Sequence, residues 1–450
     1  MSPSTPALPN PCRIGRKEMN ASKSVLLVIG SGLKLYREYL IRSASARARA
    51  AGLELVLINN LKPTWQHPYF DEIHVVNVFD HDKLRTAARE VAARRTVAGL
   101  VCYDEPLVMP AAELAAEFGV PGLSIPGVQG CRDKRSTRSR LTAAGVLQPA
   151  FEMTDSLEQA RSAAKRIGYP VVVKPRALGA SMGVVLAADE AALDAGYRVA
   201  HEASLIGDEE YRGGAIVEEY ADGPEISIDA AVHKGEYLPM FLARKRTGQY
   251  PYFEEVGHVI DADDELLRDQ ELIGTLARAH RVLEIEDGIT HTEVRLTPRG
   301  PLIIEINGRL GGDLIPFVGK IATGIDPGHV LVDAATGTRP DIAPTRSGVA
   351  GIRFGYPGHD CVVHAVRVPT ESPGLVTASP MVDPRTTLRL PPGGYIARHS
   401  FVVAEADDPA TCDARLEAAL ALVEIDATEV EPPPPGTRLE MPAGLLDADA

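Results

Sequence analysis

The sequence predicts a multidomain protein that combines the α/β and α+β classes. Residues 23–125 alternate short β-branched runs with Ala-, Arg- and Leu-rich segments, the pattern of a doubly wound α/β domain with a parallel sheet. Residues 126–220 and 221–345 mix helical and strand patterns without this alternation, and residues 346–430 are mostly β with many Pro and Gly. A chain of 450 residues has room for several such domains.

Composition and charge exclude several classes of partner. The net charge is −14 and no region is strongly basic, so we expect no nucleic-acid partner. No apolar run approaches the ~20 residues that span a bilayer, so we expect no membrane partner. Residues 1–22 lack the apolar core of a secretory signal and are expected to be a disordered tail. Residues 431–450 begin with a proline run and are expected to be a stiff, unpacked tail. The five scattered cysteines are expected to be free thiols in a cytoplasmic protein: Cys12, Cys102, Cys131, Cys361 and Cys412.

The first domain contains a glycine pair that needs an interpretation. Gly30-Ser31-Gly32 follows the first expected strand and resembles half of a dinucleotide-binding fingerprint, but no third glycine follows at the required spacing. A nicotinamide dehydrogenase is therefore not supported, and we interpret the pair as a tight turn at the mouth of a substrate site. The expected strands are Val25–Ile29, Glu54–Ile58, Ile73–Val78 and Gly99–Tyr103, and the expected helices are 36–51, 81–95 and 108–118.

Residues 126–220 read as a linker helix followed by a small α+β unit. The linker helix is basic and includes Lys134; most of its charges are expected on a solvated face, with one reaching a phosphate. A second helix begins after Ser156 and ends at Gly168. The strand that follows ends in Lys174, and the Gly- and Ser-containing loop 176–183 comes next. Such a loop can surround a polyphosphate with backbone N–H groups and an ammonium, or it can be an ordinary hairpin; the residues alone leave both open.

The next segments supply the remaining strands and helices. Residues 244–260 are polar and are expected to form a long loop, which in a compact domain is more often functional than idle. The expected strands are Ala215–Glu219, Ile226–Val232 and Tyr237–Ala243, and the expected helices are 268–284, 313–322, 326–336 and 408–422.

Residues 290–307 are predicted to form a hairpin that carries two acids. The runs Thr290–Leu296 and Leu302–Ile306 flank the turn Thr297–Gly300, and pairing across it brings Glu293 near Glu305. Two adjacent carboxylates repel each other unless a cation lies between them, and with the Asn307 amide oxygen they suit Mg²⁺. The alternative is a hairpin whose charged residues simply face water.

Taken in order, these features resemble the ATP-grasp superfamily of carboxylate–amine ligases over roughly residues 24–345. The resemblance implies an ATP-grasp fold: an N-terminal doubly wound α/β domain (23–125), a small ATP-binding lobe with a linker helix (126–220), a larger central lobe (221–345) and a C-terminal, mostly β segment (346–430). The ordered set that carries it is Lys134, Lys174, the loop 176–183, Glu218-Glu219-Tyr220, Glu293 and Glu305-x-Asn307-x-Arg309.

The resemblance also implies cofactors and residue roles. ATP and Mg²⁺ are expected, with two metal ions and with Mn²⁺ as an acceptable substitute. Lys134 and Lys174 would contact the phosphates, and Arg309 would face the transferred phosphate and the acyl group. The other implied residues are Ala180, Ser181, Met182 and Gly183 in a mobile flap, Glu218, Glu219 and Tyr220 at the adenine, Glu225 at the ribose, and Glu293, Glu305 and Asn307 at the metals.

Within the superfamily the sequence is most similar to the L-amino acid ligases, which make dipeptides, and to carnosine synthase. This implies small-molecule substrates, amide formation through an acyl phosphate, and an assembly that is often a homodimer. Glu255, His258 and Arg309 would line the amino-acid pocket, and the acids Glu254, Glu255 and Asp313 suggest a basic amino acid. The segments that carry the likeness are Lys245–Thr247, Pro251–Glu255, Gly257-His258, His291–Glu293 and Asn307–Asp313.

Two other functions compete with a ligase. A carboxylase of the biotin carboxylase or purine-pathway type shares the acidic hairpin, but its flap is usually richer in glycine than residues 176–183, and no biotin-carrier lysine motif is present. A protein that senses ATP without catalysis has no need of Arg309 or of two metal ions. We therefore expect a ligase, although the residues do not identify the base that deprotonates the attacking amine.

Overall fold

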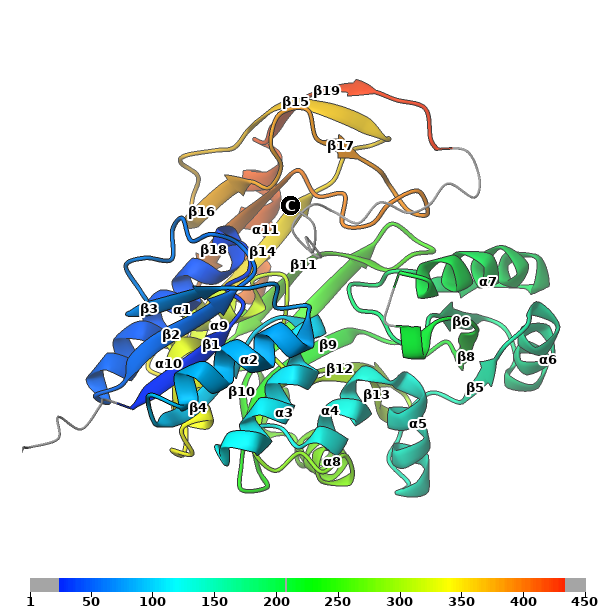
Figure 1. Ribbon diagram of the computed structural model, residues 1–450. Helices are drawn as coiled ribbons and strands as arrows, with labels where there is room; N and C mark the ends of the chain where they lie inside the picture. The colour runs from blue at the N-terminus through cyan, green and yellow to red at the C-terminus, as the bar shows by residue number, and fades with distance from the viewer. Residues whose placement is uncertain (1–23, 207–208, 434–450) are drawn as a thin grey trace, which may run out of the picture.

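The computed structural model describes residues 24–206 and 209–433, so both expected tails lie almost entirely outside the described residues. The N-terminal domain is a four-stranded parallel sheet in the order β3-β2-β1-β4 with helices packed on it, as predicted (Figure 1). Strand β1 is buried along its whole length, which explains its unbroken run of apolar residues. The elements are β1 Val25–Ile29, α1 Lys34–Ala50, β2 Glu54–Asn59, β3 Glu72–Val75, α2 His81–Ala92, β4 Val97–Cys102, η1 Glu105–Leu107 and α3 Val108–Phe118.

The small lobe is an antiparallel four-stranded sheet in the order β5-β8-β6-β7 with two helices packed against it. Ser156 caps α6 by accepting the Gln159 N–H, and the helix stops before Gly168, as predicted. The elements are β5 Phe151–Thr154, α6 Leu157–Ile167, β6 Val171–Lys174, β7 Val185–Ala187, α7 Glu190–Ser204, η2 Glu209–Tyr211 and β8 Ala215–Glu219.

The expected single basic linker helix is in fact two helices, α4 Ile125–Arg132 and α5 Lys134–Ala143. Asp133 between them has an extended backbone, and its side chain accepts the Arg135 N–H at the start of α5. The expectation of a solvated basic face was also wrong in part, because Lys134 and Arg138 are buried. These residues lie four apart, so they share the helix face that points into the protein.

An antiparallel eight-stranded sheet runs through the central lobe and into the C-terminal segment, in the order β13-β12-β9-β10-β11-β14-β18-β16. Strand β14 pairs with β11, so the sheet continues across the expected boundary at residue 345. Its strands are β9 Glu225–His233, β10 Glu236–Gly248, β11 Glu254–Asp261, β12 Gly288–Thr297, β13 Gly300–Asn307, β14 Val349–Gly355, β16 Leu375–Pro380 and β18 Ser400–Ala406.

Helices and a small sheet surround this central sheet. Helix α9 packs on β10, β11 and β14, and α10 packs on α1 and β4, which attaches the N-terminal domain. A three-stranded sheet in the order β17-β15-β19, built from the C-terminal segment, lies beyond the central sheet (Figure 1). The elements are η3 Glu265–Arg268, α8 Gln270–Val282, α9 Ile315–Thr323, α10 Pro327–Ala335, β15 Cys361–Arg367, β17 Thr387–Leu388, α11 Pro409–Leu420 and β19 Glu424–Glu429.

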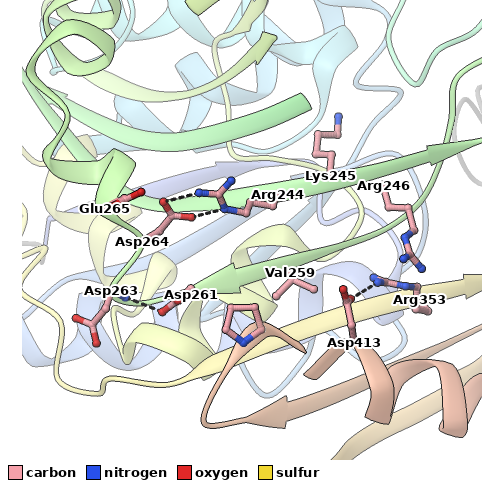
Figure 2. Close-up of a pocket in the computed structure, with 11 residues that line it drawn as sticks. Arg244, Lys245, Arg246, Val259, Asp261, Asp263, Asp264, Glu265, Arg353 and Asp413 are labelled. Carbon is pink, nitrogen blue, oxygen red and sulfur yellow. Dashed lines mark hydrogen bonds and ion pairs between the residues drawn. The ribbon is translucent and has the colours of Figure 1, made fainter. Parts of the chain in front are cut away.

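The long polar loop expected at 244–260 was wrong, because β10 and β11 occupy most of it and leave a short connection at 249–253. The polar residues there alternate between the two faces of a strand. Figure 2 shows Lys245 on the opposite side of β10 from Arg246. The charged residues Arg244 to Arg246 therefore belong to a strand with a pocket on each side, and they do not mark a solvated loop.

The described residues also bear on the membrane and cysteine expectations. Across residues 24–206 and 209–433, no helix combines the length and apolarity that crossing a bilayer requires. In the same residues Cys102, Cys131, Cys361 and Cys412 are free thiols. Cys12 lies outside the described residues.

Candidate active site

A cleft between the small lobe, the central sheet and the C-terminal segment collects most of the predicted site residues. It encloses about 1300 Å³ of space, its open mouth included. Met182, Gly183 and His258 are the predicted residues that do not border it. The predicted residues that do are Lys134, Lys174, Ala180, Ser181, Glu218, Glu219, Tyr220, Glu225, Glu255, Glu293, Glu305, Asn307 and Arg309.

Strands β12 and β13 form the predicted hairpin, which we call the acidic hairpin. Glu293 and Glu305 are directly opposite each other in its register. Each carboxylate is bonded to a lysine from elsewhere in the chain: Glu293 to Lys245 at 2.6 Å and Glu305 to Lys134 at 2.9 Å. With the neighbouring Asn307, these carboxylates offer the cleft hard oxygen donors, and this donor set fits Mg²⁺.

The second predicted lysine, Lys174, is held by a buried ion-pair chain. Its Nζ lies 2.6 Å from Glu218 Oε2, and Arg138 donates to both oxygens of the same carboxylate, at 2.7 and 3.2 Å. Burial opposes ionisation of Glu218, but Arg138 and Lys174 outweigh it and lower its pKa to about 2. Burial lowers the pKa of Lys174, an effect that Glu218 partly offsets.

Two acids with expected ligand roles have partners within the protein. The Glu218 carboxylate, expected at the adenine, binds Arg138 and Lys174 instead. The Glu225 carboxylate, expected at the ribose, contacts Lys245 at 3.1 Å and Arg295 at 2.7 Å. Sequence reasoning missed Arg138, although its position four residues after Lys134 was a usable signal.

The expected flap divides between the cleft and the core. Ala180 and Ser181 border the cleft with positive φ values of 57° and 54°, and Ser181 Oγ donates to the Phe253 carbonyl at 3.0 Å. Met182 is buried, and a Cβ on Gly183 would lie 2.6 Å from that of Ala203. Of the four expected flap residues, Ala180 and Ser181 therefore face the cleft and Met182 and Gly183 do not.

A β-bulge brings Glu255 and His258 to the same face of the sheet. Residues three apart on a regular strand point in opposite directions, but Lys245 pairs with His258 while Thr247 pairs with Glu255, leaving Val256 unpaired. His258 is fully buried, and its Nδ1 lies 2.7 Å from Glu255 Oε1. His258 therefore orients Glu255 from behind and does not touch the cleft.

Lys245 lies at the centre of the carboxylates in the cleft. Its Nζ is 3.1 Å from both Glu225 and Glu255, in addition to the 2.6 Å contact with Glu293. Burial disfavours the ammonium, but these acids outweigh burial and raise the pKa of Lys245 well above its usual value. Burial likewise opposes ionisation of Glu293, whose pKa is nevertheless held well below its usual value by Lys245 and His291.

His291 has a specific partner. Its Nδ1 lies 2.5 Å from the buried Asp229, and its Nε2 lies 3.7 Å from Glu293. Asp229 also accepts the Gly311 N–H at 3.0 Å. Burial lowers the pKa of His291, yet Asp229 and Glu293 raise it overall to about 9. His291 is therefore held as a cation at the foot of the acidic hairpin.

Arg309 joins the N-terminal domain to the site. Its Nε donates to Glu105 Oε2 at 2.7 Å and its Nη1 to the Leu310 carbonyl at 2.8 Å. Glu105 belongs to η1 and is far from Arg309 in the chain, so sequence reasoning missed it. The contact fixes the guanidinium at the edge of the cleft.

The C-terminal segment completes the wall of the cleft. Arg398 donates to the Tyr356 hydroxyl and to the Glu255 carbonyl, both at 2.9 Å, and binds both oxygens of Asp313. Glu254 accepts from the Tyr356 hydroxyl at 3.0 Å and from the Ile396 N–H. Since Glu254, Glu255 and Asp313 all have partners within the protein, they no longer argue for a basic amino acid as substrate.

A second pocket lies on the reverse face of β10 and β11 (Figure 2). Two of its arginines are paired within it: Arg244 binds Asp264 at 2.6 and 3.1 Å, and Arg353 binds Asp413. None of the residues predicted from the sequence to bind nucleotide, metal or substrate borders it. The predicted site residues are therefore concentrated in the cleft and not in this second pocket.

Comparison with known proteins points to one family. Residues 167–316 match the model of the ATP-grasp domain, and residues 45–122 match that of the ATP-grasp N-terminal domain. An alanine–anticapsin ligase from Bacillus subtilis is 28% identical over 298 residues, which span 60% of this chain and 60% of that ligase. The chain thus matches less than two thirds of that relative's length.

Solved structures share the fold. An L-amino acid ligase from Bacillus licheniformis has a TM-score of 0.72 at 20% identity, with 91% of this chain and all of that chain covered. A biotin carboxylase from Campylobacter jejuni has a TM-score of 0.66 at 17% identity, covering 91% and 93%. At these identities the likeness concerns the architecture, which the two chemistries have in common.

Proposed function

Because the chain belongs to the ATP-grasp family, we propose that it is an ATP-dependent ligase that joins an amino acid, through its carboxylate, to the amine of a second amino acid. The products would be a dipeptide or similar amide, ADP and phosphate. The similarity to an alanine–anticapsin ligase supports this choice within the family.

One observation carries the proposal. Lys134, Lys174 and Arg309 border the same cleft as the acidic hairpin, so positive groups for phosphates and oxygen donors for Mg²⁺ surround one space. We propose that Glu293, Glu305 and Asn307 hold two Mg²⁺, or Mn²⁺ in their place. The bound metal would neutralise the β- and γ-phosphate oxygens.

The reaction follows from the chemistry of a carboxylate. Its oxygen is a poor leaving group, and transfer of the γ-phosphoryl group turns it into an acyl phosphate, whose leaving group is good. Charge and positioning set the barrier to this transfer. Lys134 and Lys174 would bind the phosphate oxygens, and Arg309, fixed by Glu105, would offer its remaining N–H groups to the developing charge.

The second step needs a dry site. The attacking amine displaces phosphate from the acyl carbon, and water would do the same if it were admitted. Ala180 and Ser181 would close over the nucleotide, with Ser181 already bonded to Phe253. Glu255, oriented by His258, would hold the ammonium of the first amino acid.

The experiment is a screen of amino-acid pairs for ADP release, phosphate release and product mass. We expect ADP formation to require both a carboxylate and an amine substrate, and the product mass to equal their sum minus water. ATP consumption with bicarbonate and biotin instead would favour a carboxylase, whose fold this chain shares. Nucleotide binding with no turnover in any pair would favour a sensor.

We also propose that the protein forms a homodimer, as the resemblance implies. Light scattering, which measures the mass of the assembly, tests this proposal.

A further inference from the structure

Each acid of the acidic hairpin already has a cation, and that cation is a lysine. Lys245 reaches Glu293 from β10, and Lys134 reaches Glu305 from the start of α5. In both lysines the side chain is nine-tenths buried or more. The two ammonium groups thus offset the charges of two carboxylates that pair in register across the hairpin and would otherwise repel each other.

The place occupied by Lys245 resembles a cation site. Three carboxylate oxygens, from Glu225, Glu255 and Glu293, lie within 3.1 Å of its Nζ. Hard oxygens gathered around one positive charge are also what a divalent cation requires, at shorter distances. While the ammonium holds this position on Oε1, its charge opposes the approach of a metal ion to Glu293.

The hairpin by itself offers few further ligands. Within residues 24–206 and 209–433, no group of three or more His, Cys, Asp and Glu side chains is arranged to hold a metal ion. Mg²⁺ prefers six oxygen ligands and is usually bound by one or two carboxylates together with substrate phosphates. The missing ligands must therefore arrive with the nucleotide.

We propose that Lys245 and Lys134 act as resident counter-ions that keep the metal carboxylates occupied until nucleotide binds. Phosphate oxygens would then draw the two ammonium groups away from Glu293 and Glu305, and the freed carboxylates would accept the metal. Metal and nucleotide consequently bind only together. This inference rests on the proposed function, since it concerns the same site.

Lys134 also extends the exchange to the flap. Its Nζ donates to the Leu178 carbonyl at 2.8 Å, in the loop that carries Ala180 and Ser181. When Lys134 turns toward phosphate, it releases this carbonyl together with Glu305. Nucleotide binding would thus free the loop at the moment when it has to close.

The test uses Mn²⁺ as the probe and the electron paramagnetic resonance signal of free Mn²⁺ as the readout, with no turnover required. In the wild type we expect Mn²⁺ alone to stay free and Mn²⁺ with ADP to bind. In Lys245→Met we expect Mn²⁺ alone to bind at least about tenfold more tightly than to the wild type, because the competing charge is gone. Lys134→Met, which disturbs fewer carboxylates, should change in the same direction and guards against misfolding of the first variant.

Two matched controls isolate the effect. Lys245→Arg keeps the charge and should leave Mn²⁺ alone unbound. Lys174→Met removes a lysine of the same cleft that is paired with Glu218 and not with the hairpin, so it should weaken ADP binding without creating metal binding.

The experiment distinguishes a failure of the counter-ion role from a failure of the proposed ligase function. Tight Mn²⁺ binding to the nucleotide-free wild type, or no gain in either methionine variant, would overturn the counter-ion role and leave the ligase intact. A wild type that binds no Mn²⁺ even with ADP would overturn both.

Discussion

The replacement Arg138→Met tests whether the ion-pair chain behind Lys174 holds the site together. Arg138 is almost fully buried and donates to both oxygens of Glu218, to the Ile303 carbonyl at 3.1 Å and to the Ile304 carbonyl at 2.8 Å. It therefore ties the small lobe to the acidic hairpin. Methionine fills much of the same volume but removes every one of these donors.

The size of the effect follows from burial. Removing one partner of a buried ion pair typically costs about 3–5 kcal/mol, because the remaining charge is left uncompensated. Lys174 still faces Glu218 and keeps part of that compensation, so we expect a loss of about 3 kcal/mol. That is a large fraction of the about 5–15 kcal/mol by which proteins are usually stable.

Urea unfolding followed by circular dichroism measures this loss. Arg166→Met is the matched control, since Arg166 makes an equally well-formed double contact with Glu152, but on the exposed surface of the same lobe. Its unfolding midpoint should stay close to that of the wild type. If the two variants unfold at the same urea concentration, the argument from the buried chain is refuted. We also expect Arg138→Met to raise the KM for ATP, because Lys174 loses its fixed partner geometry.

Three further predictions concern the cleft. Glu305→Ala and Arg309→Ala should each lower ADP formation at least about a hundredfold with an unchanged circular dichroism spectrum, and wild-type turnover in Glu305→Ala would remove the metal assignment. Glu218 has a usual pKa of 4.5 and a folded-state pKa of about 2, so its stabilising effect is complete above pH 4.5 and is lost as the pH falls toward 2. The unfolding temperature of Glu218→Gln should therefore depend less on pH in that range than that of the wild type. An equal dependence in the two proteins would contradict the pairing of Glu218 with Arg138 and Lys174. His258→Ala should raise the KM for the amino acid about tenfold, the value of one hydrogen bond to a charged group, while the KM for ATP changes little. Steady-state kinetics with each substrate varied in turn measures both KM values. Equal changes in the two would count against the orienting role of His258.

The acidic hairpin could be predicted because its information is local. Two alternating runs and a four-residue turn fix the register, and the register alone places Glu293 opposite Glu305. The end of β6 at Lys174 was predictable for the same reason, since a short apolar run ends there.

The partners of these residues were not predictable in the same way. Glu105 contacts Arg309 from the N-terminal domain, and Arg398 contacts Asp313 from the C-terminal segment; no sequence spacing indicates either pair. The segment around Lys245 misled for another reason: the bulge at Val256 breaks the alternation that identifies a strand. Polar residues buried beside a ligand site look, in the sequence, like residues facing water.

The wall formed by Ile396 and Arg398 lies outside both stretches that match the family models. Part of the cleft wall thus comes from outside those stretches, while Glu255, whose carbonyl Arg398 contacts, lies within one of them. Under the proposed ligase function, exchanges in this C-terminal wall would change how Glu255 is presented to the amino acid and would leave the phosphate- and metal-binding side chains in place.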